Sequence, residues 1–493
     1  MIVLLWTDAL LWVLVAAVAG YFWLVHRREH LAAPWRRVAQ SPAGMMALVV
    51  LGAYVLVGLA DSLHFRPRLN SIGGGHAAGH TAGHTAGQTN GLAYSVEVLS
   101  VLDLVLAPLR ARTETTYSEP LATRAYAKQT VDLGGGRVTR EFPRLRFGGA
   151  HLAREEDRGR DIAARMLQGI GMGCVLWLAL SAALVAALAP RARTDPGART
   201  DFVAMWRAVW SGRTRLAWRG LLAAAGLLCV LGFTTATLAA GYHVLGTDKV
   251  GLDVLYLALK SVRTGLMIGA LTTLVMLPFA VLLGIMAGYF RGWVDDIIQY
   301  LYTTLNSIPG VLLIAAAVLM MQVYIDTHPD LFPTSAQRAD LRLLFLCVIL
   351  GLTTWTGLAR LLRGETLKLR ELEFIQAAQA FGVGHGRIIT RHVLPNVMHL
   401  VIIALVMDFS GLVLAEAVLS YVGVGVDPSM ISFGTMINAA RLEIAREPMV
   451  WWVLVAAFVF MFVLVLAANL FADAVRDAFD PRVRIGSFSE AAA

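Results

Sequence analysis

The stretch Thr264–Phe290 reads TGLMIGALTTLVMLPFAVLLGIMAGYF and contains no charged residue. A helix that crosses a bilayer needs about 20 mostly apolar residues, so this stretch is long enough to cross one. Backbone amides in lipid must find hydrogen-bond partners inside the segment, which a helix provides and an open strand does not. The stretch therefore predicts a transmembrane helix.

Eight further stretches have the same character, and only two of them contain acidic residues, Asp8 in one and Asp408 with Glu416 in another. They are Ile2–Val25, Ala43–Ala60, Met166–Ala189, Gly220–Tyr242, Ile297–Ile325, Leu343–Ala359, Val397–Val422 and Pro448–Ala472. The sequence thus predicts an all-α polytopic membrane protein with nine spans. Pro278 and Pro309 lie inside two of the spans, where proline is expected to kink a helix.

The composition agrees with a bilayer environment. Of the 493 residues 57% are hydrophobic and 15% are charged, whereas soluble domains carry about 25% charged residues. The three cysteines, Cys174, Cys229 and Cys347, all lie in apolar runs. This placement excludes a disulfide-stapled extracellular domain and a four-cysteine metal site.

Basic residues predict how the chain is oriented. Alternating the nine spans from an outside N-terminus puts 21 of the 42 Lys and Arg residues on the inside and 7 in short outside loops. The other 14 lie in the long segment 61–165, where the rule has little force. The first span lacks a preceding basic region and is too long for a cleaved signal peptide. We expect a multi-pass inner-membrane protein with its N-terminus outside and its C-terminus in the cytoplasm.

Segment 61–165 begins with a Gly/Ala/His tract in which His76, His80 and His84 recur every four residues. Imidazole is a common metal ligand, so the tract is a weak candidate for metal capture. A flexible linker with incidental histidines is the other interpretation, and the glycines favour it because they oppose a helix that would align the rings. Beyond the tract we expect a surface helix over Leu92–Leu109 and short strands over Val131–Phe147, which together form a small periplasmic subdomain.

No motif for covalent chemistry is present. The Gly-rich run Gly382–Arg387 lacks the Lys-Ser/Thr ending of a phosphate-binding loop, and the chain has no HExxH motif. No serine nucleophile elbow lies in a strand-turn-helix context. The sequence therefore does not indicate an enzyme.

The most informative loop is 360–396, between the seventh and eighth spans. Leu372, Ile375, Phe381 and the Ala377–Ala378 pair suit a short amphipathic helix with small side chains on top. Gly382 and Gly384 are expected to end it and to permit a sharp turn. A second helix is expected near Arg387. Small side chains would let a soluble partner approach closely, although a solvated helical hairpin is an equally good interpretation.

This loop resembles the EAA loop of ABC importer permeases. The matching residues are Gln376, Ala377, Ala378, Gly382, Leu394 and Pro395. Further segments are similar to dipeptide and oligopeptide permeases of the C type, which are binding-protein-dependent importers. They are His243–Leu255, Ala287–Asp296, Ala359–Gly382, Arg391–Asn396, Leu414–Val426 and Asp477–Arg484. Three positions differ from the family pattern: Gln376 replaces a glutamate, Leu252 an arginine and Val244 a proline.

The resemblance implies a type I permease core of about six helices. It also implies the following order of domains along the chain. Residues 1–60 hold two helices, the second resembling the family's first core helix. Residues 61–165 are a periplasmic insertion, 166–242 hold two further helices, 243–484 complete the core, and 485–493 are a cytoplasmic tail. About three N-terminal helices are therefore additions to the core.

The resemblance also implies the partners. These are a second permease subunit in a heterodimer, two ABC ATPase subunits that use ATP and Mg, and a periplasmic solute-binding protein. The chain itself would bind no cofactor and no nucleic acid. The expected function is peptide import, with nickel or another peptide-like solute as the alternative within the family. An ATP-independent sensor that uses 61–165 as its receptor, and a secondary transporter, are the rivals from other classes.

Asp408 and Glu416 are ionisable residues within the eighth span. Ionisable groups at such depth normally face water or a protein partner and indicate a functional site. Two roles remain open, lining of the transport pathway or hydrogen bonding at a subunit interface.

Overall fold

The computed structural model describes residues 2–67, 95, 98–132, 138–188, 202–214, 216–328 and 334–479. Within these residues, nine helical segments are long and apolar enough to cross a membrane. Each overlaps one of the nine predicted spans. The all-helical, multi-pass architecture is thereby confirmed.

The N-terminal part contains three helices and a short strand. They are β1 (Ile2–Val3), α1 (Trp6–Arg27), α2 (Glu29–Val38) and α3 (Pro42–Asp61). Ser41 caps α3, because its side chain accepts a hydrogen bond from the Gly44 amide and Pro42 occupies the first turn. β1 pairs antiparallel with β2 (His64–Phe65), so the start of the chain lies beside the end of α3.

The insertion contains small elements, and a helical hairpin follows it. The small elements are β3 (Leu99–Ser100), α4 (Val101–Val105), α5 (Ala107–Ala111), β4 (Gln129–Asp132) and β5 (Val138–Glu141). The hairpin consists of α6 (Arg158–Leu188) and α8 (Trp218–Ala239), with the short helix α7 (Phe202–Trp210) between them. β4 and β5 pair antiparallel, which confirms the short strands expected near Val131–Phe147. The continuous helix expected over Leu92–Leu109 is wrong. Leu99–Ser100 pair with β2, and Ser100 and Asp103 form a capping box that starts a new short helix.

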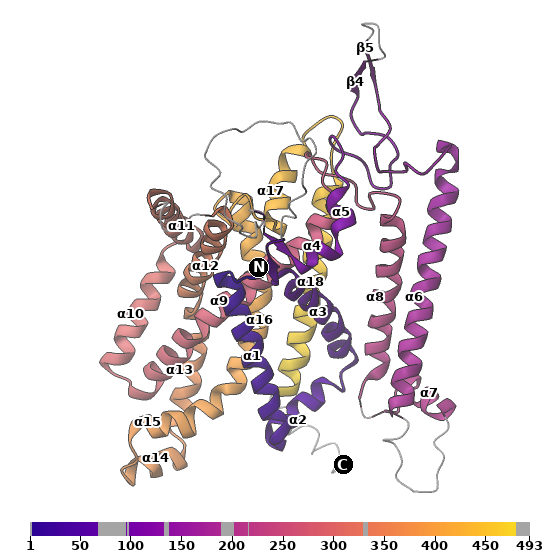
Figure 1. Ribbon diagram of the computed structural model, residues 1–493. Helices are drawn as coiled ribbons and strands as arrows, with labels where there is room; N and C mark the ends of the chain where they lie inside the picture. Colours follow the sequence, from indigo (N-terminus) through magenta and orange to yellow (C-terminus); the bar gives the residue numbers. More distant parts are fainter. Residues whose placement is uncertain are drawn as a thin grey trace, which may run out of the picture.

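Close glycine contacts hold α6 against α8. A Cβ on Gly169 would lie 2.5 Å from the Thr234 Cα, and one on Gly173 would lie 2.7 Å from the Val230 Cα. Small residues four apart let two membrane helices approach to backbone contact. The pair stands beside α3 at one flank of the bundle (Figure 1).

The remaining helices form the body of the bundle. They are α9 (Val254–Phe290), α10 (Trp293–Ser307), α11 (Gly310–Thr327), α12 (Ser335–Thr354), α13 (Thr356–Arg370), α14 (Glu373–Ala380), α15 (His385–Ile388), α16 (Leu394–Val422), α17 (Phe433–Glu443) and α18 (Trp452–Phe479). The central helix is α9, half of whose apolar stretch is buried. It packs against α3, α12, α13, α16 and α18.

The single span predicted over Ile297–Ile325 is instead two helices, α10 and α11, which are separated at Ile308–Pro309. Pro309 has no N–H and disfavours a helical conformation at the residue before it, so the helix stops and restarts there. Pro278, in contrast, lies inside the uninterrupted α9. Neighbouring helices pack closely around that stretch of α9 and tolerate the proline.

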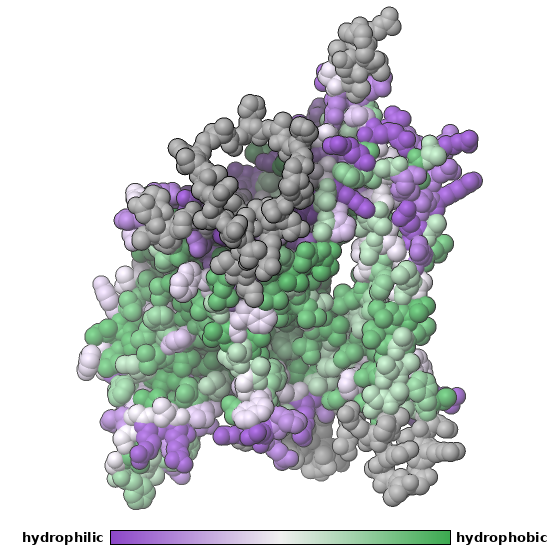
Figure 2. Space-filling view, viewed as in Figure 1, coloured by the Kyte–Doolittle hydropathy of each residue, from purple (hydrophilic) through white to green (hydrophobic). Residues whose placement is uncertain are grey.

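The bundle has two opposite ends. The loop end carries α14, α15, α2, α7 and the C-terminal end of α18, whereas the insertion end carries α5, α17 and the β4–β5 hairpin (Figure 1). Figure 2 shows a hydrophobic belt between hydrophilic surfaces at these two ends. This is the surface of a protein with the bilayer around its middle. The His76, His80 and His84 tract and the 485–493 tail lie outside the described residues.

Candidate functional site

The predicted coupling loop forms a short helical projection at the loop end of the bundle. α13 leads into it, α14 forms its tip, and α15 continues through a π-helical turn (Ile389–Val393) into α16. The helix expected near Arg387 is therefore present, and it is continuous with the next span. Leu394 and Pro395 occupy the first turn of α16, where a proline is well tolerated.

α14 attaches to the bundle through one deeply buried side chain, Ile375. Ile375 belongs to a cluster with Leu362, Ile388 and Val393, and Ala378 packs against that cluster. Burying one isoleucine contributes about 1.5–3 kcal/mol, so the attachment is modest. Leu372 and Phe381, which were expected on the same apolar face, are instead exposed.

The outer face of α14 is exposed, and its contacts within the described chain are a Gln376 hydrogen bond to the Glu371 carbonyl at 3.2 Å and the Phe374 ring beside His392. Gln376 and Ala377 are exposed, and Phe381 exposes 86% of its surface. Phe374 is also exposed beside them. Exposed apolar side chains gathered at a loop tip, away from the hydrophobic belt, indicate a protein contact surface.

Gly382 and Gly384 lie between α14 and α15, and only position 382 has a backbone conformation that favours glycine. Its φ is +71°, in the left-handed region, although no atom would clash with an added Cβ. Gly384 has a φ of −61°, which any residue can adopt. The sharp turn predicted at this position is thus made by Gly382 alone.

Tyr289, at the end of α9, holds the loop in place. Its hydroxyl lies 2.9 Å from His385 Nδ1 and accepts a hydrogen bond from Gln379 Nε2 at 3.3 Å. Its carbonyl accepts from an Arg370 guanidinium N–H at 2.9 Å. The loop is therefore fixed to the end of α9, which has the largest buried share among the membrane-spanning helices of the described chain. The sequence pattern included Tyr289 only as part of a matching segment.

An ion pair adds a second attachment. The Arg363 guanidinium donates from Nε and from one terminal nitrogen to the two Asp295 carboxylate oxygens, at 2.6 and 2.7 Å. Such a bidentate pair fixes orientation as well as distance. It joins α13 to the first turn of α10 beyond the end of α9, and Arg291 pairs with Glu371 nearby.

Comparison with known proteins gives a consistent answer. Residues 280–485 match the family described as binding-protein-dependent transport system inner membrane component. An oligopeptide transport system permease protein, OppC, of Mycobacterium bovis is 33% identical over 242 residues, which cover 49% of this chain and 77% of the relative. The chain belongs to this family of transport permeases.

Two further relatives match with similar coverage. A glutathione transport system permease protein, GsiD, of Pectobacterium atrosepticum is 31% identical over 49% of this chain and 73% of its own length. A dipeptide transport system permease protein, DppC, of Alkalihalophilus pseudofirmus has the same identity and coverage. The family is one of transport permeases rather than enzymes.

Asp408 and Glu416, the two acidic residues of the eighth predicted span, have different environments. Glu416 is completely buried, and its Oε1 accepts hydrogen bonds from the Ser420 hydroxyl at 2.7 Å and the Ser432 hydroxyl at 2.8 Å. Since Ser432 caps α17, Glu416 ties α16 to α17 within the chain. Asp408 is half-buried and has no hydrogen-bond or ion-pair partner in the part of the chain that the structure describes. Only Asp408 therefore remains available to a second molecule or to water.

A charged network near the insertion end has no counterpart among the sequence predictions. The Arg263 guanidinium donates to Asp8 Oδ1 at 2.7 Å, and His64 Nδ1 lies 2.8 Å from Asp8 Oδ2. In the same layer Lys260 Nζ pairs with Asp103 at 2.6 Å and Asp61 at 3.1 Å. The charge in the first span is visible in the sequence, but its partner is 255 positions away.

The network joins the additional helix α1 to the core at a second point. Asp340, on α12, accepts hydrogen bonds from the Thr7 hydroxyl and from the Thr7 amide at 3.2 Å. α1 is thus fixed to both α9 and α12 by polar contacts, in a layer where a lone charge would be costly.

Another polar cluster, around His243, attaches the insertion to the loop that precedes α9. His243 Nδ1 lies 2.8 Å from Asp253 Oδ2, and His243 Nε2 lies 3.4 Å from Glu114 Oε1. Glu114 also accepts backbone hydrogen bonds, from Arg146 at 2.9 Å and Phe147 at 2.8 Å. Burial by itself would lower the pKa of His243, but the Asp253 and Glu114 carboxylates outweigh this effect and raise the pKa to about 9. The His243 and backbone hydrogen bonds similarly lower the pKa of Glu114 to about 2 despite its burial.

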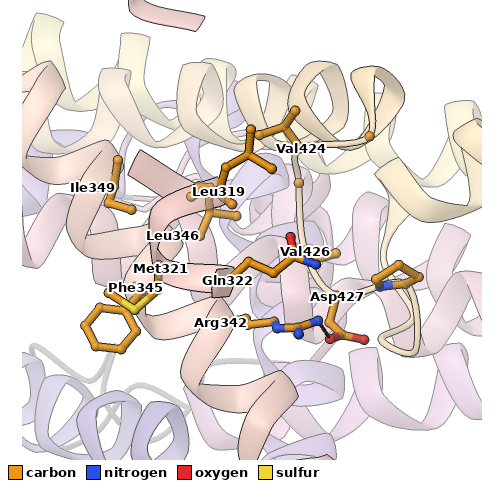
Figure 3. Close-up of a pocket in the computed structure, with 14 residues that line it drawn as sticks. Leu319, Met321, Gln322, Arg342, Phe345, Leu346, Ile349, Val424, Val426 and Asp427 are labelled. Atoms are coloured by element: carbon orange, nitrogen blue, oxygen red, sulfur yellow. Dashed lines mark hydrogen bonds and ion pairs between the residues drawn. The ribbon is translucent and has the colours of Figure 1, made fainter. Parts of the chain in front are cut away.

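A small pocket of about 90 Å³ lies between α11, α12 and the turn after α16 (Figure 3). Arg342 at its edge pairs with Asp427 and, at 2.9 Å, with Asp326. The arginine thereby joins three elements. Its charge is already matched within the chain.

Among the described residues, no group of three His, Cys, Asp or Glu side chains is arranged to hold a metal ion. The metal-capture interpretation concerns only His76, His80 and His84, which are not among those residues.

Proposed function

We propose that this permease is one transmembrane subunit of an ATP-driven importer of peptides, through which a solute passes from a periplasmic binding protein to the cytoplasm. Its relatives are named as oligopeptide, dipeptide and glutathione transport permeases, and glutathione is itself a tripeptide. The observation that carries the coupling role is α14, which is exposed on its outer face and donates a hydrogen bond from Gln379 to the Tyr289 hydroxyl of α9. The flanking helices α13 and α15 also contact Tyr289, through Arg370 and His385.

The attachment suggests how energy reaches the pathway. A soluble ATPase subunit that uses ATP and Mg would receive α14 in a groove, with Ala377 permitting close approach and Phe381 serving as an apolar anchor. Displacement of α14 would pull on Tyr289 and on the Arg363–Asp295 pair. Both contacts lead directly to α9 and α10, so the motion would enter the middle of the bundle.

A second permease subunit would complete the pathway and form a heterodimer. α10 and α11 support this, because they project from one side of the bundle and α11 packs chiefly on α12 (Figure 1). Their exposed side chains include Trp293, Tyr300, Leu312 and Met320. Asp408, half-buried and without a partner in the described chain, is a candidate for lining the pathway or for meeting this second subunit.

The orientation belongs to the same proposal. The loop end would face the cytoplasm, because the ATPase subunits are there and the inside excess of Lys and Arg falls on the segments at that end. The start of the chain, beside β2, would then be periplasmic and the C-terminus cytoplasmic.

The test is uptake of labelled peptides by proteoliposomes that contain the assembled transporter, its binding protein and internal ATP. Ala377→Trp should abolish uptake and co-purification of the ATPase, because the indole would block close approach. Ser211→Trp is the control, since Ser211 is exposed at the loop end but far from α14. Wild-type uptake by Ala377→Trp would refute coupling through α14. Uptake of nickel without uptake of any peptide would refute the substrate class.

A further inference from the structure

An apolar pocket of about 460 Å³ lies inside the bundle, between the additional helix α1 and four helices of the core. α3, α9, α16 and α18 form its other walls, and every lining residue belongs to a membrane-spanning helix. The walls are almost entirely aliphatic and aromatic. They include Leu14, Val15, Val55, Ala270, Phe409 and Phe471.

The pocket opens to the lipid around the protein. Val18 of α1 and Val55 of α3 line it and are also exposed on the outside of the bundle. Both belong to helices long and apolar enough to cross the membrane, where the surrounding solvent is hydrocarbon. An apolar cavity of this kind does not fill with water.

The volume favours a single hydrocarbon chain. A cavity of about 150 Å³ accommodates a six-carbon ring, so this pocket has room for roughly three times as many carbons. That is about the length of one fatty acyl chain. A helix about 10 Å in diameter, rising 1.5 Å per residue, would fill the same volume with only about one turn. The pocket is therefore too small to receive a spanning helix of another subunit.

The end nearest the insertion carries the one charged residue of the lining, Arg263. Its side chain is 8% exposed, and one terminal nitrogen donates to Asp8. Its Nε–H is buried and has no acceptor among the described residues. A buried donor without an acceptor costs about 1–3 kcal/mol, which an ester or phosphate oxygen at this position would recover.

A second pocket, of about 310 Å³ and with both charged and apolar residues in its lining, also has Arg263 in its wall. Lys260, Asp61 and Asp340 line it, but Lys260 pairs with Asp61 and Asp340 accepts hydrogen bonds from Thr7. A compartment that contains polar groups and an apolar compartment thus meet at one arginine, as the two ends of an amphiphile require. The Arg263 Nε–H, which has no acceptor among the described residues, is the group that suits a phosphate or ester oxygen.

We propose that the permease binds one membrane phospholipid at this place, with an acyl chain between α1 and the core and its ester or phosphate oxygens at Arg263. The lipid fills the space that the additional helix α1 leaves against the core. This site is independent of α14 and of the transported solute, so the inference stands or falls separately from the proposed function.

The first test fills the pocket. Val15→Trp and, separately, Ala270→Leu should reduce the phospholipid that stays bound when the purified protein is transferred from detergent into native mass spectrometry. Val13→Trp is the matched control, because Val13 is on the same helix, is exposed and does not line the pocket. We expect one retained phospholipid in the wild type and in Val13→Trp, and at least a tenfold lower occupancy in both filling variants. Equal retention in all four proteins would overturn the proposal.

The second test identifies the occupant in the transporter purified into detergent and washed free of loosely bound lipid. A photo-crosslinking amino acid at position 15 should yield an adduct with the mass of a phospholipid, and the same residue at position 13, which then faces detergent, should give a much weaker one. An adduct with a peptide of the partner permease, or with transported solute, would show that another molecule occupies the pocket. Either result would refute the lipid site.

Discussion

At the scale of single residues, Gly382 is the position in the 360–396 loop where backbone geometry alone restricts the side chain. A residue with a Cβ in the left-handed region costs about 1–2 kcal/mol, and here no steric clash adds to that cost. Gly382→Ala should therefore lower ATP-dependent uptake several-fold, and Gly382→Val should lower it more. Membrane insertion should stay intact, since the loop lies outside the spans.

The control for this prediction is Gly384→Ala, two residues further on. Its backbone is extended and its φ is negative, so alanine should be tolerated and uptake should remain near the wild-type level. An equal loss of uptake in both variants would contradict the turn as the cause. It would mean that a partner protein requires positions without side chains here, whatever their backbone conformation.

The His243 cluster predicts a pH dependence at the same scale. The pKa of His243 is raised from its ordinary 6.5 to about 9, so its favourable contribution is complete below pH 6.5 and disappears as the pH rises through 9. Glu114, with its pKa lowered from 4.5 to about 2, contributes above pH 4.5 and loses that contribution as the pH falls through 2. Between pH 4.5 and 6.5 both contributions are therefore fully present.

The measurement is the difference in melting temperature between the wild type and His243→Gln in detergent. This difference should be largest near pH 6 and should shrink towards zero above pH 9. Hydrogen exchange of the Glu114 and Leu121 amides, corrected for intrinsic rates, should show that the loosened segment is the insertion. The Glu114 amide donates to the Gly251 carbonyl and the Leu121 amide to the His243 carbonyl. A difference that does not vary with pH would contradict a charged His243.

At the scale of whole elements, one buried ion pair, Asp8 with Arg263, fixes α1 to α9. Asp8→Asn leaves Arg263 without its carboxylate in a buried position, and breaking such a pair typically costs about 3–5 kcal/mol. We expect a lower melting temperature and faster proteolysis near α1. The double variant Asp8→Asn with Arg263→Gln should recover part of the loss, because it removes the uncompensated charge.

Asp157→Asn serves as the control for charge removal, since Asp157 is exposed at the start of α6. It should leave the melting temperature unchanged. If Asp8→Asn behaved like this control, the polar layer would not be what holds α1 against the core.

At the scale of the whole molecule, the two ends of the bundle should lie on opposite sides of the membrane. In a variant without its three native cysteines, Ala153→Cys at the insertion end should react with a membrane-impermeant thiol reagent added to spheroplasts. Ser211→Cys at the loop end should react only after the membrane is permeabilised. Both positions are exposed, so access alone decides the outcome. The reverse pattern would invert the proposed orientation.

Local features of the chain follow from neighbouring residues alone. Length and apolarity locate all nine spans, because a bilayer imposes both requirements on each segment separately. The position of the loop helix and of its terminating Gly382 is likewise a local property. The prediction for Leu372 and Phe381 is wrong because periodicity shows which residues share a face. It does not show whether the bundle covers that face.

The sequence by itself determined the number of spans, the loop that projects between two of them and the resemblance of that loop to permeases. Only the tertiary structure decided the partners of the charges: Asp8 with Arg263, Glu114 with His243, and Glu416 with Ser432. It also decided that Tyr289 is the contact through which the loop meets α9, and that α1 leaves an apolar pocket. These features depend on residues far apart in the chain, and no local pattern specifies which distant side chain will satisfy a buried charge or fill the space between two helices.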